Sequence, residues 1–206
     1  MAEVRWRKTV GPAELTKISV GSMDNNVYFI AVGDDVAVVD GGSNELDAVL
    51  AELGGRRLEM VLQTHNHGDH IATLPELVEA TKAPVYAHPA DADRIPVPTT
   101  KLDDGATIGL GGCLFKVLHT PGHTPGAVCF LLEESDERHL FAGDTLFPGG
   151  PGNTFGNAQA FETIMDSLDS KLFVLPDDTN VYPGHGDDTT IGNERAQVDT
   201  WRARGW

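Results

Sequence analysis

The amino-acid sequence predicts a layered α/β domain on three observations. Short apolar or β-branched runs recur along the chain, separated by turns rich in Gly, Pro and Asp. Apolar residues at helical spacing stand between these runs. With 206 residues, 40% of them hydrophobic and 22% charged, the chain is long enough to bury a core and has a globular composition. We therefore expect one domain over residues 1–206, in which small sheets are flanked by helices.

The first part of the chain predicts strands and two helices. Apolar residues recur from Leu46 to Leu53 at positions i, i+3, i+4 and i+7, which predicts a helix. Ser43 or Asn44 would cap the start of this helix, and Gly54 would end it. Strands are expected over residues 15–20, 26–32, 36–40, 58–62 and 85–87, and a second helix over residues 74–81.

The second part repeats this pattern after a stretch, residues 89–111, whose frequent Pro, Asp and Gly predict no regular element. The apolar spacing from Phe161 to Leu168 predicts a third amphipathic helix, and a last helix is expected after Gly192. Strands are expected over residues 114–118, 127–132, 139–142 and 179–182.

The charge and the cysteine content limit the partners. The chain has 31 acidic and 15 basic residues, a net charge of −16, whereas a general nucleic-acid binder needs a basic surface. No apolar run is long enough to cross a membrane, and the first residues lack the apolar stretch of a secretory signal. The two cysteines, Cys113 and Cys129, make no disulfide framework and are expected to pack as small apolar residues. We therefore expect a cytoplasmic protein without a nucleic-acid or membrane partner.

One short segment, residues 64–70, concentrates side chains that bind metal ions. His65 and His67 alternate, so an extended backbone directs both to one side. Asp69 and His70 follow at once and turn across the same site. The segment comes directly after an apolar run, and its spacing can offer ligands to two adjacent cations.

Three further candidate ligands share one context: each follows an apolar run and stands in a Gly- or Pro-rich turn, where α/β sheets place their sites. They are His123, Asp144 and His185. The candidates together make five imidazoles and two carboxylates. Zinc prefers three protein ligands at a catalytic site, so two such sites with a shared carboxylate need about seven ligands. Two Zn²⁺ ions are the expected cofactors, and iron or manganese suits the same ligand types.

The segment from Thr64 to His70, followed by His123, Asp144 and His185, resembles the metallo-β-lactamase superfamily. The resemblance extends from about residue 24 to residue 195. Residues 119–126, 143–147 and 183–186 are most similar to the glyoxalase II branch, and within it to short bacterial proteins that stop soon after the last ligand.

The resemblance implies a four-layer αββα sandwich with the metal ions at one edge of the two sheets. Asp40 matches an aspartate that orients a ligand histidine, and Asp69 is also expected to be the catalytic carboxylate. The implied ligand sets are His65, His67 and His123 for the first metal ion, Asp69, His70 and His185 for the second, and Asp144 as the bridge between them.

These ligands predict a hydrolase with a binuclear metal centre. Two adjacent cations lower the pKa of a water between them toward about 7, which makes hydroxide available at neutral pH. A thiolate leaves readily because the pKa of a thiol is about 8.5. The expected substrate is therefore a small-molecule thioester or related acyl compound. An amide would need a proton donor, and Tyr182, the one candidate, is expected to be a core residue instead.

Other activities on the same fold are alternatives. Mononuclear-iron persulfide dioxygenases also resemble this sequence and share nearly all of these ligands, so metal content and oxygen uptake must distinguish them. The negative charge disfavours a phosphodiesterase or nuclease. Asp144 in the bridging position disfavours a true β-lactamase, and the full set of ligands disfavours a scaffold without catalysis.

The loop over residues 147–156 departs from the glyoxalase II pattern. Relatives often place a basic residue where Asn153 stands, and this loop has no charged residue. Only 21 residues follow His185, so the helical domain that helps glyoxalase II to hold glutathione is not expected. The carboxylates of glutathione need Arg or Lys partners, so we expect weak glutathione dependence or none. Phe147, Asn153 and Phe155 are expected to line the substrate pocket.

The three remaining histidines, His88, His119 and His139, are not in ligand positions. We expect His139 to be exposed in a charged turn and His119 to pack near the site.

Overall fold

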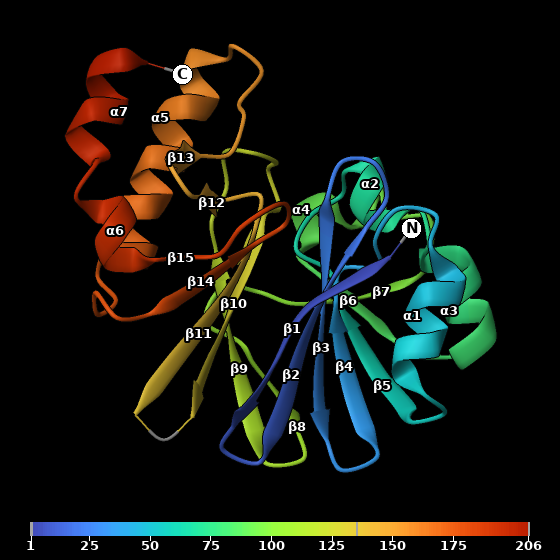
Figure 1. Cartoon of the computed structure of the whole chain (residues 1–206). Coiled ribbons are helices and arrows are strands. Elements are labelled where there is room, and N and C mark those ends of the chain that lie inside the picture. The colour runs from blue at the N-terminus through green and yellow to red at the C-terminus, as the bar shows by residue number, and fades with distance from the viewer. Residues whose placement is uncertain (1, 135, 206) are drawn as a thin grey trace.

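Two β-sheets lie face to face in the computed structural model, which describes residues 2–134 and 136–205 (Figure 1). The first sheet has seven strands in chain order. Its first four strands pair antiparallel, and the remaining ones pair parallel. The strands are β1 (Glu3–Val10), β2 (Ala13–Val20), β3 (Asn25–Val32), β4 (Asp35–Val39), β5 (Arg57–Leu62), β6 (Val85–Ala87) and β7 (Thr99–Lys101).

The second sheet has six strands in the order β15-β14-β11-β10-β9-β8. Only the β11–β14 pair is parallel. The strands are β8 (Thr107–Leu110), β9 (Cys113–His119), β10 (Val128–Glu134), β11 (Glu137–Gly143), β14 (Asn180–Pro183) and β15 (Thr189–Thr190). A separate hairpin consists of β12 (Leu146–Phe147) and β13 (Gly150–Pro151).

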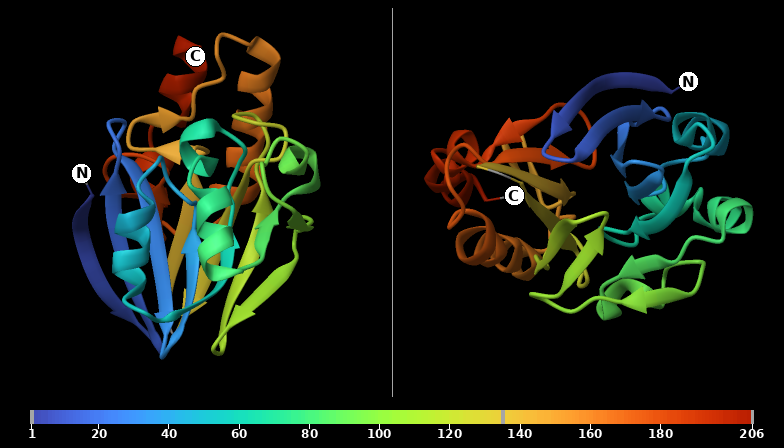
Figure 2. Two further views of the ribbon diagram at one scale, coloured as in Figure 1. Left: turned by 90° about the vertical axis from the view of Figure 1, so that its right-hand side faces the viewer. Right: turned by 90° about the horizontal axis from the view of Figure 1, so that it is seen from below.

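Helices cover the outer face of each sheet, so that four layers follow one another (Figure 2). On the first sheet lie α1 (Leu46–Leu53) and α3 (Leu74–Thr81), with the short α2 (Gly68–Ile71) and α4 (Pro89–Ala92) near its edge. On the second lie α5 (Ala158–Ser167), the π-helical turn η1 (Leu168–Leu172), α6 (Ile191–Arg195) and α7 (Val198–Arg204). Among the described residues, no helix is long and apolar enough to cross a membrane.

The strands are apolar on both faces because both faces are buried. In β3, Tyr28 and Ile30 point into the core between the sheets, whereas Val27 and Phe29 point into the core under α1 and α3. β10 alternates in the same way, with Cys129 facing the core under α5 to α7. This double burial explains the near-continuous apolar runs of the sequence. The four-layer αββα sandwich implied by the resemblance is confirmed.

Most expected elements are confirmed to within one or two residues, and the differences have physical reasons. β1 was not predicted, because it is an edge strand whose side chains are mostly exposed and polar. The predicted cap of α1 was wrong: the helix begins after Glu45 without a side-chain cap. Residues 89–111, for which no regular element was predicted, contain α4, β7 and β8.

The loops that follow β4, β5, β9, β11 and β14 meet at one edge of the sandwich (Figure 1). These are the loops that carry Asp40 and the seven candidate metal ligands. The hairpin turns at the opposite edge carry none of these residues.

Candidate metal centre

The loop after β5 presents four of the candidate ligands within six residues, 65–70. His65 and His67 follow the strand, His67 in extended conformation, and their ring centroids lie 4.9 Å apart. His67 precedes the first residue of α2, so that Asp69 and His70 lie on this helix. His65 and His70 are buried, whereas His67 and Asp69 are partly accessible. The switch from strand to helix is what turns the second pair of ligands away from the first.

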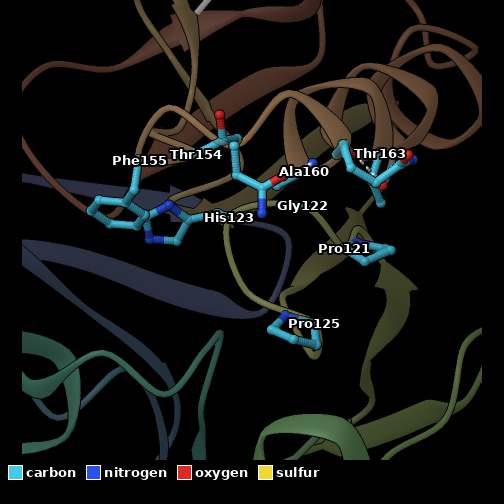
Figure 3. Close-up of a pocket in the computed structure, with 10 residues that line it drawn as sticks. Pro121, Gly122, His123, Pro125, Thr154, Phe155, Ala160 and Thr163 are labelled. Atoms are coloured by element: carbon cyan, nitrogen blue, oxygen red, sulfur yellow. Dashed lines mark hydrogen bonds between the residues drawn. The ribbon is translucent and has the colours of Figure 1, made fainter.

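Three other loops bring the remaining candidates to the same place. His123 lies in the turn after β9 and beside Phe155 (Figure 3). Asp144 follows β11, and His185 follows β14. A Cβ atom at Gly184 would collide with Asp144 Oδ1, so only glycine lets this loop approach so closely.

The candidates form two clusters. In each cluster the three potential ligand atoms lie within 4.8 Å of one another. The first cluster, here called the first triad, is His65, His67 and His123; the second triad is Asp69, His70 and His185. These are the same two sets that the resemblance implied.

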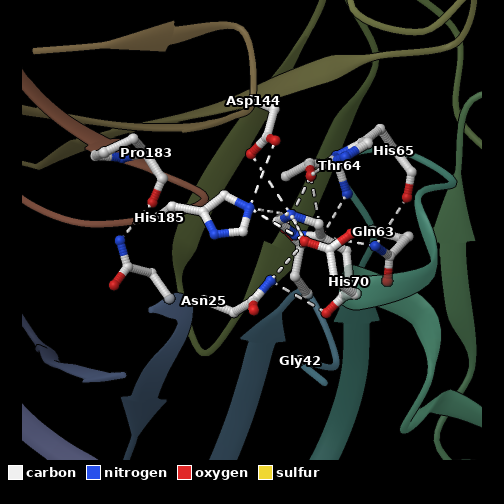
Figure 4. Close-up of polar contacts among 12 residues, drawn as sticks. Asn25, Gly42, Gln63, Thr64, His65, His70, Asp144, Pro183 and His185 are labelled. Carbon is white, nitrogen blue, oxygen red and sulfur yellow. Dashed lines mark hydrogen bonds and ion pairs between the residues drawn. The ribbon is translucent and has the colours of Figure 1, made fainter. Parts of the chain in front are cut away.

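Asp144 contacts histidines of both triads, and Figure 4 shows it beside His185 and His70. Its Oδ2 is 3.4 Å from His123 Nε2 in the first triad and 3.6 Å from His185 Nε2 in the second. Its Oδ1 is 3.5 Å from His70 Nε2. The carboxylate therefore contacts both triads, as a bridging ligand requires.

Three of the histidines are held by a hydrogen bond from Nδ1 to another part of the protein, and their Nε2 atoms point toward the centre of the site. His70 Nδ1 donates to Asp40 Oδ2 at 2.9 Å, and His123 Nδ1 donates to the carbonyl of Asn153 at 2.8 Å. His185 Nδ1 donates to the carbonyl of Met23 at 2.9 Å. Such outer bonds fix the tautomer and orientation of a metal-binding imidazole.

Buried ligand atoms without a hydrogen-bond partner make the site suitable for metal ions. His65 Nε2, His123 Nε2 and Asp144 Oδ1 are buried without a hydrogen-bond partner among the described residues. A buried polar atom without a partner is costly, and a coordinated cation would remove that cost. Imidazole nitrogens and carboxylate oxygens suit zinc, iron and manganese alike.

The two triads differ in charge. Burial lowers the pKa of all three histidines of the first triad, most strongly for His65. Burial also acts on His70, but the carboxylates of Asp40, Asp144 and Asp69 outweigh it and raise the pKa of His70 to about 9. The pKa of Asp144 is held well below its usual range by the imidazoles around it, against the effect of burial.

Asp40 connects the site to the end of β4. Its backbone has a positive φ of 59°, which is uncommon for a residue other than glycine and directs the carboxylate under the ligands. Asp40 bonds to His70 directly and accepts from the Thr64 hydroxyl, which in turn contacts His65 Nδ1 at 2.9 Å. Gln63 Nε2 also donates to Asp40, at 2.8 Å. A single carboxylate thus orients one histidine of each triad.

A second buried carboxylate, Asp91, was not predicted. It is 1% exposed, and its two oxygens accept from the backbone N–H groups of Asn66 and Gly126 and from the hydroxyl of Thr124. Asn66 lies between His65 and His67, and Thr124 follows His123. Asp91 therefore ties together the two loops of the first triad. Its partners lie 25 to 35 residues away, so no local pattern marks it.

The loop of the second triad has a different support, in which Asn25 and Asn26 match residues of the resembled family and Lys17 was not predicted. Lys17 is buried in β2, and its ammonium donates to the carbonyl of Gly186 and to Asp188, both at 2.6 Å. Asn25 Nδ2 donates to Asp69 Oδ2 at 2.9 Å, and Asn26 Nδ2 donates to the carbonyl of Pro183. Side chains from β2 and β3 thus hold both ends of the His185 loop.

The three expected substrate residues lie on both sides of the triads. Phe155 is 69% exposed, with its ring 5.7 Å from His67 and 5.9 Å from His123. The Phe147 ring lies 6.3 Å from His185. Asn153 accepts from the backbone N–H of Phe155 through its side chain and holds His123 through its carbonyl.

The expectation that His139 is exposed was wrong. Its side chain is buried in β11, with Nδ1 bonded to the Tyr182 hydroxyl at 2.8 Å and its ring stacked on the Tyr182 ring of the neighbouring strand β14. Tyr182 is itself buried between the sheets, as expected. His119 stacks on His88 with ring centroids 3.8 Å apart and is not part of either triad. Cys113 and Cys129 are buried and unpaired, as expected.

Comparisons with known proteins agree with this architecture. The chain is 35% identical over 211 residues to an uncharacterized protein of Mycobacterium tuberculosis, covering 88% of this chain and 94% of the relative. It is 37% identical over 164 residues to a hydroxyacylglutathione hydrolase of Rhodopseudomonas palustris, covering 79% of this chain and 62% of that protein. The chain thus spans less than two thirds of the length of this second relative.

Solved structures show the same fold. ETHE1 from Myxococcus xanthus has a TM-score of 0.76 at 30% identity, covering 88% of this chain and 81% of that chain. The protein TTHA1623, solved in a di-iron-bound form, has a TM-score of 0.72 at 32% identity, covering 87% of this chain and 96% of that chain. Residues 20–185 match the metallo-beta-lactamase superfamily, a range that includes every residue of both triads. The chain belongs to the metallo-β-lactamase superfamily.

Proposed function

We propose that the protein is a metal-dependent hydrolase that cleaves a thioester or a related acyl compound at a binuclear centre. The observation that carries this proposal is the placement of Asp144 between two triads of metal-binding side chains. A pair of metal ions held by these residues would supply hydroxide at neutral pH and polarise the acyl carbonyl. Zinc is the proposed metal, with iron or manganese as the possible replacements.

Each residue of the site has a definite part in the proposal. His65, His67 and His123 hold the first ion, and Asp69, His70 and His185 hold the second. Asp144 fixes the two sites relative to each other. Asp69 is partly accessible and its pKa is lowered, so it stays ionised and can accept a hydrogen bond from the attacking water. The proposal assigns no residue as a proton donor to the leaving group, because a thiolate needs none.

Two hydroxyacylglutathione hydrolases among the relatives support an acyl substrate, and a solved iron-bound structure bears on a second candidate reaction. Hydroxyacylglutathione hydrolases of Rhodopseudomonas palustris and of Synechococcus are 37% and 39% identical to the chain over their shared regions. The second candidate is a mononuclear-iron persulfide dioxygenase, since its ligands are nearly the same. TTHA1623, solved in a di-iron-bound form, supports iron as a metal on this fold but with two ions. The two unpaired cysteines favour a reducing, cytoplasmic setting for either reaction.

The test is release of free thiol from S-lactoylglutathione and from acetyl thioesters of neutral thiols by zinc-loaded protein. Asp144→Ala is the control, because it removes the contact between the triads while leaving each triad complete. Thiol release that is lost in the variant supports a binuclear hydrolase. Oxygen uptake with a persulfide on iron-loaded protein, without thioester cleavage, would establish the dioxygenase instead.

A further inference from the structure

A hollow of about 680 Å³ opens next to His123, on the side of the first triad that faces α5. Its volume falls within the range of small-molecule sites. Figure 3 shows Phe155 and His123 at one end of this hollow, Pro121 and Pro125 on one side, and Ala160 and Thr163 of α5 on the other. Because His123 belongs both to the hollow and to the first triad, a bound molecule can reach the reacting centre from here.

None of the described residues that line this hollow has a charged side chain. Its polar groups are limited to His123, two threonine hydroxyls and the side-chain amides of Asn157 and Gln159. A neighbouring hollow shares Pro121 and contains Lys171, but this ammonium is paired with Asp104 at 2.5 Å. An anionic ligand would therefore lose its hydration without gaining a free cation in return.

Phe155 is held in an unusual conformation at the junction of the hollow and the first triad. Its φ is +55°, a left-handed value that is strained for a bulky residue, although the residue is 69% exposed. An exposed aromatic ring gains little from burial, so folding alone does not explain this cost. The conformation is fixed by the bond from the Phe155 N–H to Asn153 Oδ1 at 2.7 Å. The ring thereby forms a continuous apolar wall from the two histidines into the hollow.

A second, smaller hollow of about 360 Å³ lies on the other side of the site, between residues 147–153 and His185. Among its lining residues only His185 is ionisable. The reacting centre is thus flanked by a large apolar hollow and a small uncharged one. This asymmetry suits a substrate with one long arm and one short arm.

We propose that the hollow beside His123 binds an uncharged, apolar arm of the acyl substrate, with Phe155 as the residue that determines this specificity. The inference rests on the proposed function for the reaction itself but concerns the class of substrate. Medium-chain acyl compounds with a neutral partner on the other side of the scissile bond meet both requirements. Glutathione conjugates, which carry carboxylates, do not.

The test is a series of thioesters in which the acyl chain grows from acetyl to octanoyl on one neutral thiol, followed by a series in which the thiol grows at constant acyl group. In one of the two series we expect kcat/KM to rise by about threefold to fourfold for each methylene that becomes buried. Phe155→Ala and Ala160→Asp should flatten this rise. Ala158→Asp, the same change at an exposed position of α5 outside the hollow, should leave the rise intact.

The matching S-alkyl thioethers, which cannot be hydrolysed, separate this inference from the proposed reaction. Their affinity, measured by calorimetry on zinc-loaded protein, should rise with chain length and show a negative heat-capacity change. Thioester cleavage with no dependence on either chain overturns the inference and leaves the proposed function intact. Chain-dependent thioether binding without cleavage of any thioester supports the hollow and refutes the reaction. Faster cleavage of glutathione thioesters than of neutral ones with the same acyl group also overturns the inference.

Discussion

Each triad takes two ligands from the loop after β5 and one from another loop, and yet the two triads differ in electrostatics. The first triad consists of imidazoles only, and burial lowers the pKa of each one. The second triad includes Asp69 and lies against Asp40, so the pKa of His70 rises to about 9. The first triad is therefore ready to bind a metal ion at neutral pH, whereas the second must first release a proton. Two neighbouring metal sites with similar ligands can thus differ in the pH at which they bind a metal ion.

The supports of the two triads differ as well. Asp91 joins the loops of the first triad through hydrogen bonds to backbone and hydroxyl groups, without touching a ligand side chain. Asp40 and Lys17 support the second triad, one by a bond to His70 and the other by an ion pair with Asp188 beside the His185 loop. Asp91 thus holds the loops of the first triad through their backbone and a hydroxyl group, whereas Asp40 bonds a ligand ring of the second triad directly.

The largest effect should come from removing the residue that both triads share. In Asp144→Ala we expect one bound metal ion in place of two, and a loss of activity of at least about a hundredfold, because even outer partners of a metal site cost up to about that much. Metal content after dialysis, measured by mass spectrometry, checks the first point. Two tightly bound ions in the variant would refute the bridging position.

The next effect separates the two supports. Asp91→Asn places an amide N–H group against donors, so we expect the zinc affinity of the first triad to fall by about 10- to 100-fold. Asp40→Asn should weaken the second triad more than the first, since its bond to His70 is direct and its link to His65 passes through Thr64.

Stepwise titration with Co²⁺, followed by its absorption spectrum, distinguishes the two sites in both variants. Thermal unfolding of the metal-free variants is the control for general loss of structure. If both variants weaken the two triads equally, the supports are not separate and the comparison fails.

A smaller effect concerns pH. In the metal-free protein His70 carries a proton at pH 7, and a metal ion that takes its Nε2 must displace this proton. The affinity of the second triad should therefore rise by about tenfold for each pH unit up to about 9, whereas that of the first triad stays nearly constant above pH 7. For stability the sign is opposite: the proton on His70 stabilises the metal-free fold below its unfolded pKa of about 6.5, and this is lost as pH rises through about 9. Zinc calorimetry in two buffers of different ionisation enthalpy counts the protons released, and equal release at both triads would contradict the assignment.

Features marked by neighbouring residues in the sequence were predicted, and features that depend on contacts between distant residues were missed. The segment from Thr64 to His70 shows the ligand pattern within one loop, and the apolar runs show the buried strands. Asp91 was missed because its role depends on partners that only folding brings near. His139 was placed on the surface because its neighbours in the sequence are charged, whereas in the fold it is buried against Tyr182 of the neighbouring strand β14.

The smallest effect is expected far from the triads. Tyr182→Phe removes the hydroxyl that bonds to His139 at 2.8 Å and lies 3.3 Å from Lys8 Nζ. Since this hydroxyl faces the β1 side of the core and not the ligands, we expect kcat/KM to change by less than about twofold. We also expect a loss of about 1–2 kcal/mol in the free energy of unfolding, measured in urea, because the buried His139 loses a partner. A large fall in kcat with unchanged stability would instead make Tyr182 a proton donor and reopen amide substrates, which the proposed thioester reaction otherwise excludes.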